Sequence, residues 1–527
     1  MNTAARRQGD RSFTRRARGT AGSRWRGWTA WLGRAALLCG ALGAHAQSAD
    51  RLTLQEVLDA ALESSVDIQI AASLVRFGQG ELLVARSLFD PLVTMSGSRS
   101  RTPLPGLSEV VTTQTGSALT LAMSQRLRSG VQLLPSISIE QLEVDRPTAS
   151  ATNVGTVSFR LVAPLLEDRG GKSGRLSEKA AEVALAGDQW NLHHQRAITA
   201  FQVGAAFWNY LAAQRRLEVF VLSQKRAELL VDEMQELVAE EERPAADLIQ
   251  VEGNAAAKSS DRIAAEQTVS EARRQLGLIV GLAGSQIAGL PLPGDDFPTP
   301  TPFPTDPETV SALVEQALNR RADLEAAHRQ EDSSRFLAEA AEDALKAKLD
   351  LSLTAGYSGI DAGLGIGDFL GGLNRNVPGL SAAVSLRYEL PIANAAAEGS
   401  LAQSRSIADQ RQLLREDVER TIRAAVPVAA EALRRAELQV AEAERAIALN
   451  HTTVENEIEK HRLGSATLID VILAEDRLTS TQLAAVNAYL NYALALATLR
   501  FETGTLVEVD ATIAVDADRF LRRPSPR

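Results

Sequence analysis

The chain has 527 residues, enough for several ordinary domains or for one elongated architecture. Apolar residues make up 45 % and aromatic residues only 4 %, a composition that allows a buried core and favours long helices. The net charge is −10, and because residues 1–46 contribute +8, the remainder carries −18. That acidic balance argues against nucleic acid as a partner.

Residues 1–46 have the pattern of a secretory signal peptide. A basic segment precedes the short apolar run Ala35–Gly43, and Ala44–Ala46 is an A-x-A cleavage signature. We therefore expect export. Cys39 lies in the apolar run, where its lipidation stays open. Cleavage after Ala46 leaves a chain without cysteine, which excludes disulfide and thiol chemistry.

Residues 47–290 form the first of two predicted repeats. The amphipathic helix Leu52–Leu62 opens it, and strands are expected over about 91–163 because segments such as Ser117–Met123 alternate between apolar and polar residues. A helical hairpin follows over about 175–285. Such alternation fits strands of a membrane barrel, with lipid outside and water inside, or a soluble sheet with one buried face.

The second predicted repeat covers residues 308–506, and a C-terminal tail covers 507–527. A proline-rich stretch at 291–307 separates the repeats as an extended linker. The second repeat again has an amphipathic helix, strands over about 349–390 and a helical hairpin over about 400–502. Within those strands the glycine-rich stretch Gly359–Gly379 is interpreted as a loop.

The last helix of the second hairpin is the most informative part of the sequence. Thr467 and Asp470 have the spacing of a helix start, and Gly464 lies in the turn before them. Two adjacent coiled-coil seams follow, both rich in alanine. A simple hairpin needs one seam, so two seams predict a helix with neighbours on both sides, as in a ring of helices. Gly504 is placed to end the helix.

This stretch resembles the TolC family of outer-membrane efflux channels. The resemblance is carried by Gly464, by Asp470 six residues later, and by Gly504-Thr505-Leu506 after a long helix. It implies a mainly α-helical fold with a β-barrel section: two tandem repeats of helical hairpins and transmembrane strands, completed by three subunits as one α/β barrel. The family has two strands per repeat. The first strand section has room for another pair, which either extends the barrel or forms an external loop.

The same resemblance implies a periplasmic aperture at the hairpin tips. Asp470 matches a ring of acidic residues that narrows the pore, and Asp247 is its equivalent in the first hairpin; both are also expected to cap their helices. The second acidic ring of the family corresponds to Leu473. The family's tip tyrosine corresponds to His461, and its locking arginine to Ala466, so the polar gate is only partly present.

The first hairpin tip has Glu241 where the family has a glycine. The second tip is the expected docking surface for a periplasmic adaptor protein. Its residues are Arg462, Leu463, Gly464 and Ser465.

The resemblance implies an exit duct in the cell outer membrane that extends into the periplasm. As a homotrimer in outer-membrane lipid, it would conduct substrates passively for a tripartite efflux or type I secretion system driven by an inner-membrane RND or ABC pump. The sequence has no catalytic constellation, no cofactor loop, and no histidines at metal-ligand spacing, so no enzyme, cofactor or metal is expected. The alternative is a periplasmic coiled-coil adaptor or structural protein that never enters the membrane.

Overall fold

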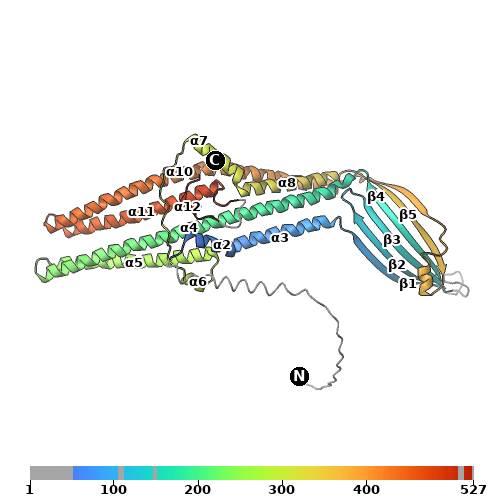
Figure 1. The fold of residues 1–527 in the computed structure, drawn as a ribbon, viewed down its shortest axis with the longest axis horizontal. Helices are drawn as coiled ribbons and strands as arrows, with labels where there is room; N and C mark the ends of the chain where they lie inside the picture. Colours follow the sequence, from blue (N-terminus) through green and yellow to red (C-terminus); the bar gives the residue numbers. More distant parts are fainter. Residues whose placement is uncertain (1–50, 105–111, 146–150, 509–514, 525–527) are drawn as a thin grey trace, which may run out of the picture.

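The protein is a long, narrow molecule in which a bundle of helices leads into a single curved sheet (Figure 1). The computed structural model describes residues 51–104, 112–145, 151–508 and 515–524; the predicted signal peptide lies outside them. Within those ranges, none of the helices combines the length and apolar character needed to cross a bilayer.

The first repeat contains one of the two longest helices. Its helices are α2 (Leu54–Ser64), α3 (Val66–Ser87), α4 (Lys172–Ala239), α5 (Ala245–Val280) and α6 (Gly284–Ala288). Thr53 caps α2 in a reciprocal capping box with Glu56, which fixes where the predicted amphipathic helix begins. Helices α4 and α5 form the first hairpin.

The second repeat follows the same order. Its helices are α7 (Pro307–Arg320), α8 (Ala322–Asp343), α9 (Ile366–Gly371), α10 (Ala395–Arg462) and α11 (Leu468–Glu502), with α12 (Asp518–Leu521) in the C-terminal tail. Asp306 caps α7, and Pro307 occupies its first position, where no backbone donor is lost. Helices α10 and α11 form the second hairpin.

The long helices lie side by side as a single curved layer. Near the sheet the packing order is α3, α4, α8 and α10, and toward the tips it is α5, α4, α11 and α10. The seam predicted for α11 is buried in this layer, including Val471, Ala474, Leu478 and Ala485. Alanine at these positions allows the helix backbones to approach closely. Near the sheet the outermost helices are therefore α3 and α10, on opposite long sides of the molecule (Figure 1).

Six antiparallel strands form the sheet in sequence order. They are β1 (Leu92–Leu104), β2 (Thr112–Arg126), β3 (Gln132–Val144), β4 (Thr152–Pro164), β5 (Lys348–Ala362) and β6 (Ser381–Glu389). The first repeat supplies four strands and the second supplies two. Within the described residues, β1 and β6 each pair with one neighbour and are the edges.

The two faces of the sheet differ in chemistry. Because side chains alternate along a strand, the pairing register assigns each residue to a face. One face carries large apolar side chains from all six strands: Val93, Met95, Leu119, Leu121, Ile137, Ile139, Val157, Phe159, Leu351, Leu353, Val384 and Leu386. The other face carries mainly hydroxyl and small side chains, and on it the Ser136 and Ser158 hydroxyl oxygens lie 2.8 Å apart.

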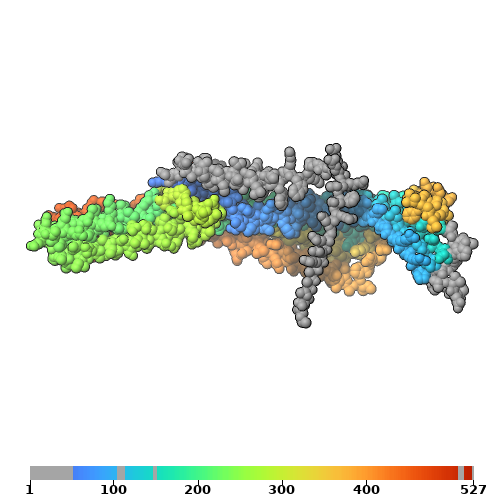
Figure 2. Space-filling view, turned by 90° about the horizontal axis from the view of Figure 1, so that it is seen from below, coloured from blue at the N-terminus to red at the C-terminus, as the bar shows by residue number. Residues whose placement is uncertain are grey.

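The glycine-rich stretch 359–379 is more ordered than the predicted loop. Residues up to Ala362 continue β5, and α9 follows. The chain then folds onto the apolar face, where a Cβ added to Gly155 would lie 2.5 Å from the carbonyl carbon of Gly372. Figure 2 shows this segment as a compact mass over the sheet end of the molecule. Two facing glycines in β4 and β5, Gly155 and Gly359, make that close approach possible.

The proline-rich stretch 291–307 crosses the middle of the helical layer, in an extended form until α7 begins. It is not a free spacer. The Phe297 ring packs 5.9 Å from Trp208 of α4 and 6.0 Å from Tyr489 of α11. The backbone N–H of Phe303 donates to Glu437 of α10 at 3.1 Å. The stretch therefore ties the two hairpins together beside the main hydrophobic core around Trp208.

Candidate functional site

The tip of the second hairpin is a tight turn held by local hydrogen bonds. Helix α10 ends at Arg462, and Gly464 has φ of 73°, the left-handed conformation that glycine adopts without strain. The N–H of Ser465 donates to the carbonyl of Lys460 at 2.9 Å. The Nδ1 atom of His461 lies 3.0 Å from the carbonyl oxygen of Ala466, so His461 stabilises its own turn.

Asp470 closes the turn as the third residue of α11, in a reciprocal capping box with the N-cap residue Thr467. The Thr467 N–H and hydroxyl donate to its Oδ2 at 2.8 and 2.7 Å, and the Asp470 N–H donates to the Thr467 hydroxyl at 3.3 Å. These hydrogen bonds, led by the one from the Thr467 hydroxyl, hold the pKa of Asp470 below its usual value. The carboxylate is exposed, so it stays charged within the capping box.

The predicted docking residues form the exposed end of the molecule. Arg462, Leu463, Gly464 and Ser465 are all exposed, whereas His461 and Ala466 are half-buried beneath them. Leu463 keeps 74 % of its surface accessible, although it is a large apolar side chain. The tip therefore presents an apolar side chain beside a guanidinium group.

The first hairpin tip reaches a similar backbone turn with different residues. Glu241 has φ of 61°, so a glutamate adopts the left-handed conformation that Gly464 adopts in the second tip. The prediction that Asp247 caps its helix is wrong in detail: the capping position of α5 is Pro244, which makes no side-chain cap. Asp247 lies in the first turn, where a negative charge favours the helix dipole.

Ion pairs join the two hairpins a few turns above the tips. Arg226 of α4 donates from Nε to Glu475 of α11 at 2.5 Å and from Nη2 to the Thr479 hydroxyl at 3.3 Å. Lys258 of α5 donates to Asp476 at 2.5 Å. Each pair combines one residue of the first hairpin with one of the second, so these contacts hold the hairpins together.

These pairs connect residues that are far apart in the sequence. Arg226 lies 249 positions from Glu475, and nothing in its local pattern marks it. On α11, Ile469 and Leu473 are exposed at one-turn spacing, although both are apolar. Leu473, which the resemblance matched to an acidic ring, therefore presents an exposed apolar side chain.

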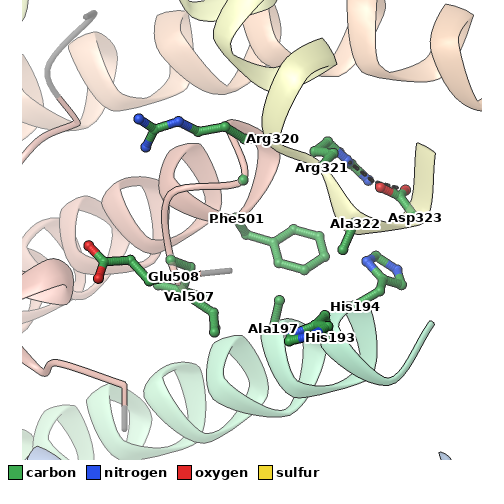
Figure 3. A pocket seen from close by; sticks show the side chains of 12 residues that line it. His193, His194, Ala197, Arg320, Arg321, Ala322, Asp323, Phe501, Val507 and Glu508 are labelled. Atoms are coloured by element: carbon green, nitrogen blue, oxygen red, sulfur yellow. Dashed lines mark hydrogen bonds and ion pairs between the residues drawn. The ribbon is translucent and has the colours of Figure 1, made fainter. Parts of the chain in front are cut away.

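A small cavity lies at the junction of the two repeats, where the C-terminal end of α11 meets the start of α8 (Figure 3). It measures about 30 Å³, room for roughly one water molecule. Arg321 lies at its edge, donating to both oxygens of Asp323 at 3.0 and 2.7 Å and pairing with Glu502. The cavity is a structural junction, too small for an organic substrate.

Gly504 in the Gly-Thr-Leu motif has a packing role at this junction. Its φ is 66°, and an added Cβ would lie 3.0 Å from the carbonyl carbon of Arg320. Near it, burial lowers the pKa of His194 on α4, an effect that Asp323 partly offsets. In the described residues, no three histidine, cysteine or acidic side chains come together as metal ligands.

Comparison with known proteins gives matches at the level of structure. No family model and no curated protein sequence matches the chain. The outer-membrane channel CmeC of Campylobacter jejuni superimposes with a TM-score of 0.65 at 16 % identity, covering 87 % of both chains. The outer-membrane protein VceC of Vibrio cholerae gives 0.63 at 15 % identity, covering 86 % of this chain and 96 % of its own.

The open state of the Neisseria gonorrhoeae outer-membrane channel MtrE is also similar. Its TM-score is 0.59 at 17 % identity, with 86 % of this chain and 88 % of the MtrE chain covered. The protein therefore has the fold of bacterial outer-membrane channels, the fold that the resemblance to the TolC family predicted.

Proposed function

We propose that the protein is a homotrimeric outer-membrane channel, the exit duct of a tripartite efflux or type I secretion system. The observation that carries this proposal is that the helical layer and the sheet end on the same two sides of the protomer. On each side an outermost helix is joined in sequence to an edge strand. Helix α3 leads into edge strand β1, and edge strand β6 leads toward α10. Three copies joined edge to edge would close both layers at once into one tube.

The outermost helices carry apolar side chains suited to such an interface. On α3, one stripe remains 55–72 % exposed: Val66, Ile70, Leu74, Phe77 and Val84. On α10, Ile407, Leu414, Val428 and Leu449 are 49–69 % exposed and lie at multiples of seven residues. Heptad spacing of exposed apolar residues is typical of a helix that packs against a partner helix.

The sheet supports insertion into lipid. An apolar face shared by six strands, opposite a face rich in hydroxyl groups, is the pattern of a barrel with lipid outside and water inside. The alternative is a periplasmic coiled-coil adaptor or structural protein. It does not explain why the two repeats share a sheet with one apolar and one polar face. We infer passive conduction, since the sequence has no nucleotide-binding motif and an inner-membrane pump would supply the energy.

The hairpin tips would form the periplasmic aperture. In the proposed trimer, Asp470 contributes three carboxylates around the axis, which attract cations, and Leu473 contributes an apolar ring that resists wetting. The exposed residues Arg462 to Ser465 would dock a periplasmic adaptor protein, which links the duct to an inner-membrane RND or ABC pump. Asp247 lies near the tip of the first hairpin and is expected to add negative charge there.

The test is current through the purified protein in planar lipid bilayers. We expect discrete cation-selective channels, and Asp470→Asn should lower the cation selectivity. The control is Asp518→Asn, which removes a carboxylate from α12, far from the tips. Absence of channels from correctly folded protein would overturn the proposal. An equal loss of cation selectivity in both variants would show that Asp470 does not line the aperture.

A further inference from the structure

We propose that the membrane section of this channel is an eighteen-stranded barrel, with six strands from each of three copies. The inference rests on the proposed trimer and adds a property that the resemblance did not imply. Two strands per repeat would give twelve strands in a trimer, whereas the first repeat here supplies four strands to one continuous sheet. The additional hairpin is β2 and β3.

The first argument is that β2 and β3 are built like the rest of the wall. They have 15 and 13 residues, against 15 in β5. Pairing between β2 and β3 runs from Gln114 opposite Val144 to Arg126 opposite Gln132, close to the full length of both strands. An external flap would need neither matched length nor pairing on both sides.

The second argument is that β2 and β3 keep the two-faced pattern. Leu121 of β2 is opposite Ile137 of β3 on the apolar face, and Thr120 is opposite Ser138 on the polar face. These two layers continue into β4 as Val157 and Thr156. Each strand therefore has an apolar side for lipid and a polar side for water, as a barrel wall requires.

The third argument is that the hairpin turn is fixed to the strand-to-helix junction. Arg128, in the turn between β2 and β3, donates two hydrogen bonds of 2.9 Å to Glu178 of α4. Gly130 and Gly171 have φ of 82° and 69°, and a Cβ added to Gly171 would lie 2.7 Å from the Gly130 nitrogen and 2.2 Å from the Arg128 carbonyl oxygen. The turn thus lies on the start of α4, at the level where the other strands join their helices.

Six strands per copy widen the channel. With strands about 4.8 Å apart and tilted by about 40°, eighteen strands give a backbone diameter of about 36 Å, against about 24 Å for twelve. The segment after β5 packs on part of the apolar face, around Gly155 and Gly359, and among the described residues it makes these contacts on that face. A barrel of this width makes the hairpin tips, and not the membrane section, the point that limits substrate size.

Single-cysteine variants in a Cys39→Ser background test the wall directly in outer-membrane vesicles, using a water-soluble maleimide. Polar-face variants Thr120→Cys and Ser138→Cys should react about tenfold faster or more than apolar-face variants Leu121→Cys and Ile137→Cys, because lipid disfavours the thiolate that reacts.

Matched variants in β5, Ser352→Cys and Leu353→Cys, separate this inference from the proposed channel. They belong to the wall whether it has twelve or eighteen strands. Alternation in β5 together with equal labelling of both faces in β2 and β3 would overturn the eighteen-stranded wall and leave the channel standing. Loss of alternation in β5 as well would overturn the barrel itself.

Discussion

The Arg226–Glu475 pair is the clearest candidate for the contact that keeps the hairpins closed. The two side chains are 30 % and 20 % exposed, so the pair lies between a solvent-exposed ion pair and a fully buried one. A charge-assisted hydrogen bond in this setting contributes about 1–2 kcal/mol. If three copies open together, the loss is about 3–6 kcal/mol, which raises the opening equilibrium by roughly 10²–10⁴.

Open probability in planar bilayers measures this effect. Arg226→Ala should increase the open time, and so should Glu475→Ala. The increase in open time for the double variant should be much smaller than the sum of the two single increases, because both substitutions break the same contact. Lys179→Ala is the matched control, since its partner Glu182 lies on the same helix and both side chains are 52 % exposed. Independent effects of the two substitutions, or an equal effect of the control, would refute the reasoning.

Three further predictions concern backbone conformation and pH, each read from the thermal midpoint of the oligomer. Gly504→Ala should lower the free energy of unfolding by at least about 1 kcal/mol, because its φ of 66° is left-handed and the added Cβ would contact Arg320. The control Gly399→Ala, where the added Cβ enters open space within α10, should not destabilise the protein. Glu241→Gly should stabilise the first tip by up to about 1 kcal/mol, since relief of the left-handed strain exceeds the added freedom of the unfolded chain; a lower midpoint would contradict this. Burial lowers the pKa of His194 below 6.5, so its contribution to stability is complete above that pH and is lost as pH falls through the folded pKa. His194→Gln should therefore flatten the pH dependence below pH 6.5, and an unchanged profile would count against it.

Local features of the sequence predicted the helices, the strands and one cap correctly, because each depends on residues close together in the chain. The Thr467–Asp470 capping box needs only a spacing of three, and the buried seam of α11 follows from periodicity alone. Asp247 shows where a matched position misleads. Its equivalence to Asp470 predicted a cap, but Pro244 occupies the capping position and has no side-chain acceptor.

Features that join distant segments could not be predicted. Arg226 and Glu475 are 249 residues apart, and only folding of both hairpins brings them together. The role of β2 and β3 was open for the same reason: alternation marks a strand but not its neighbour. The structure shows their neighbours in the protomer: β2 pairs with β1, and β3 pairs with β4. The order in the glycine-rich stretch after β5 also depends on distant residues, because the stretch packs on β4 of the other repeat as well as on β5.

The central claim is that three copies close one channel in the outer membrane. The most direct measurement is heat-modifiable migration of the protein from the outer-membrane fraction, combined with cross-linking. We expect a detergent-resistant trimer that becomes a monomer on heating, because the exposed apolar stripes of α3 and α10 and the edges β1 and β6 are buried between copies. A soluble periplasmic monomer would contradict the account and favour the coiled-coil alternative.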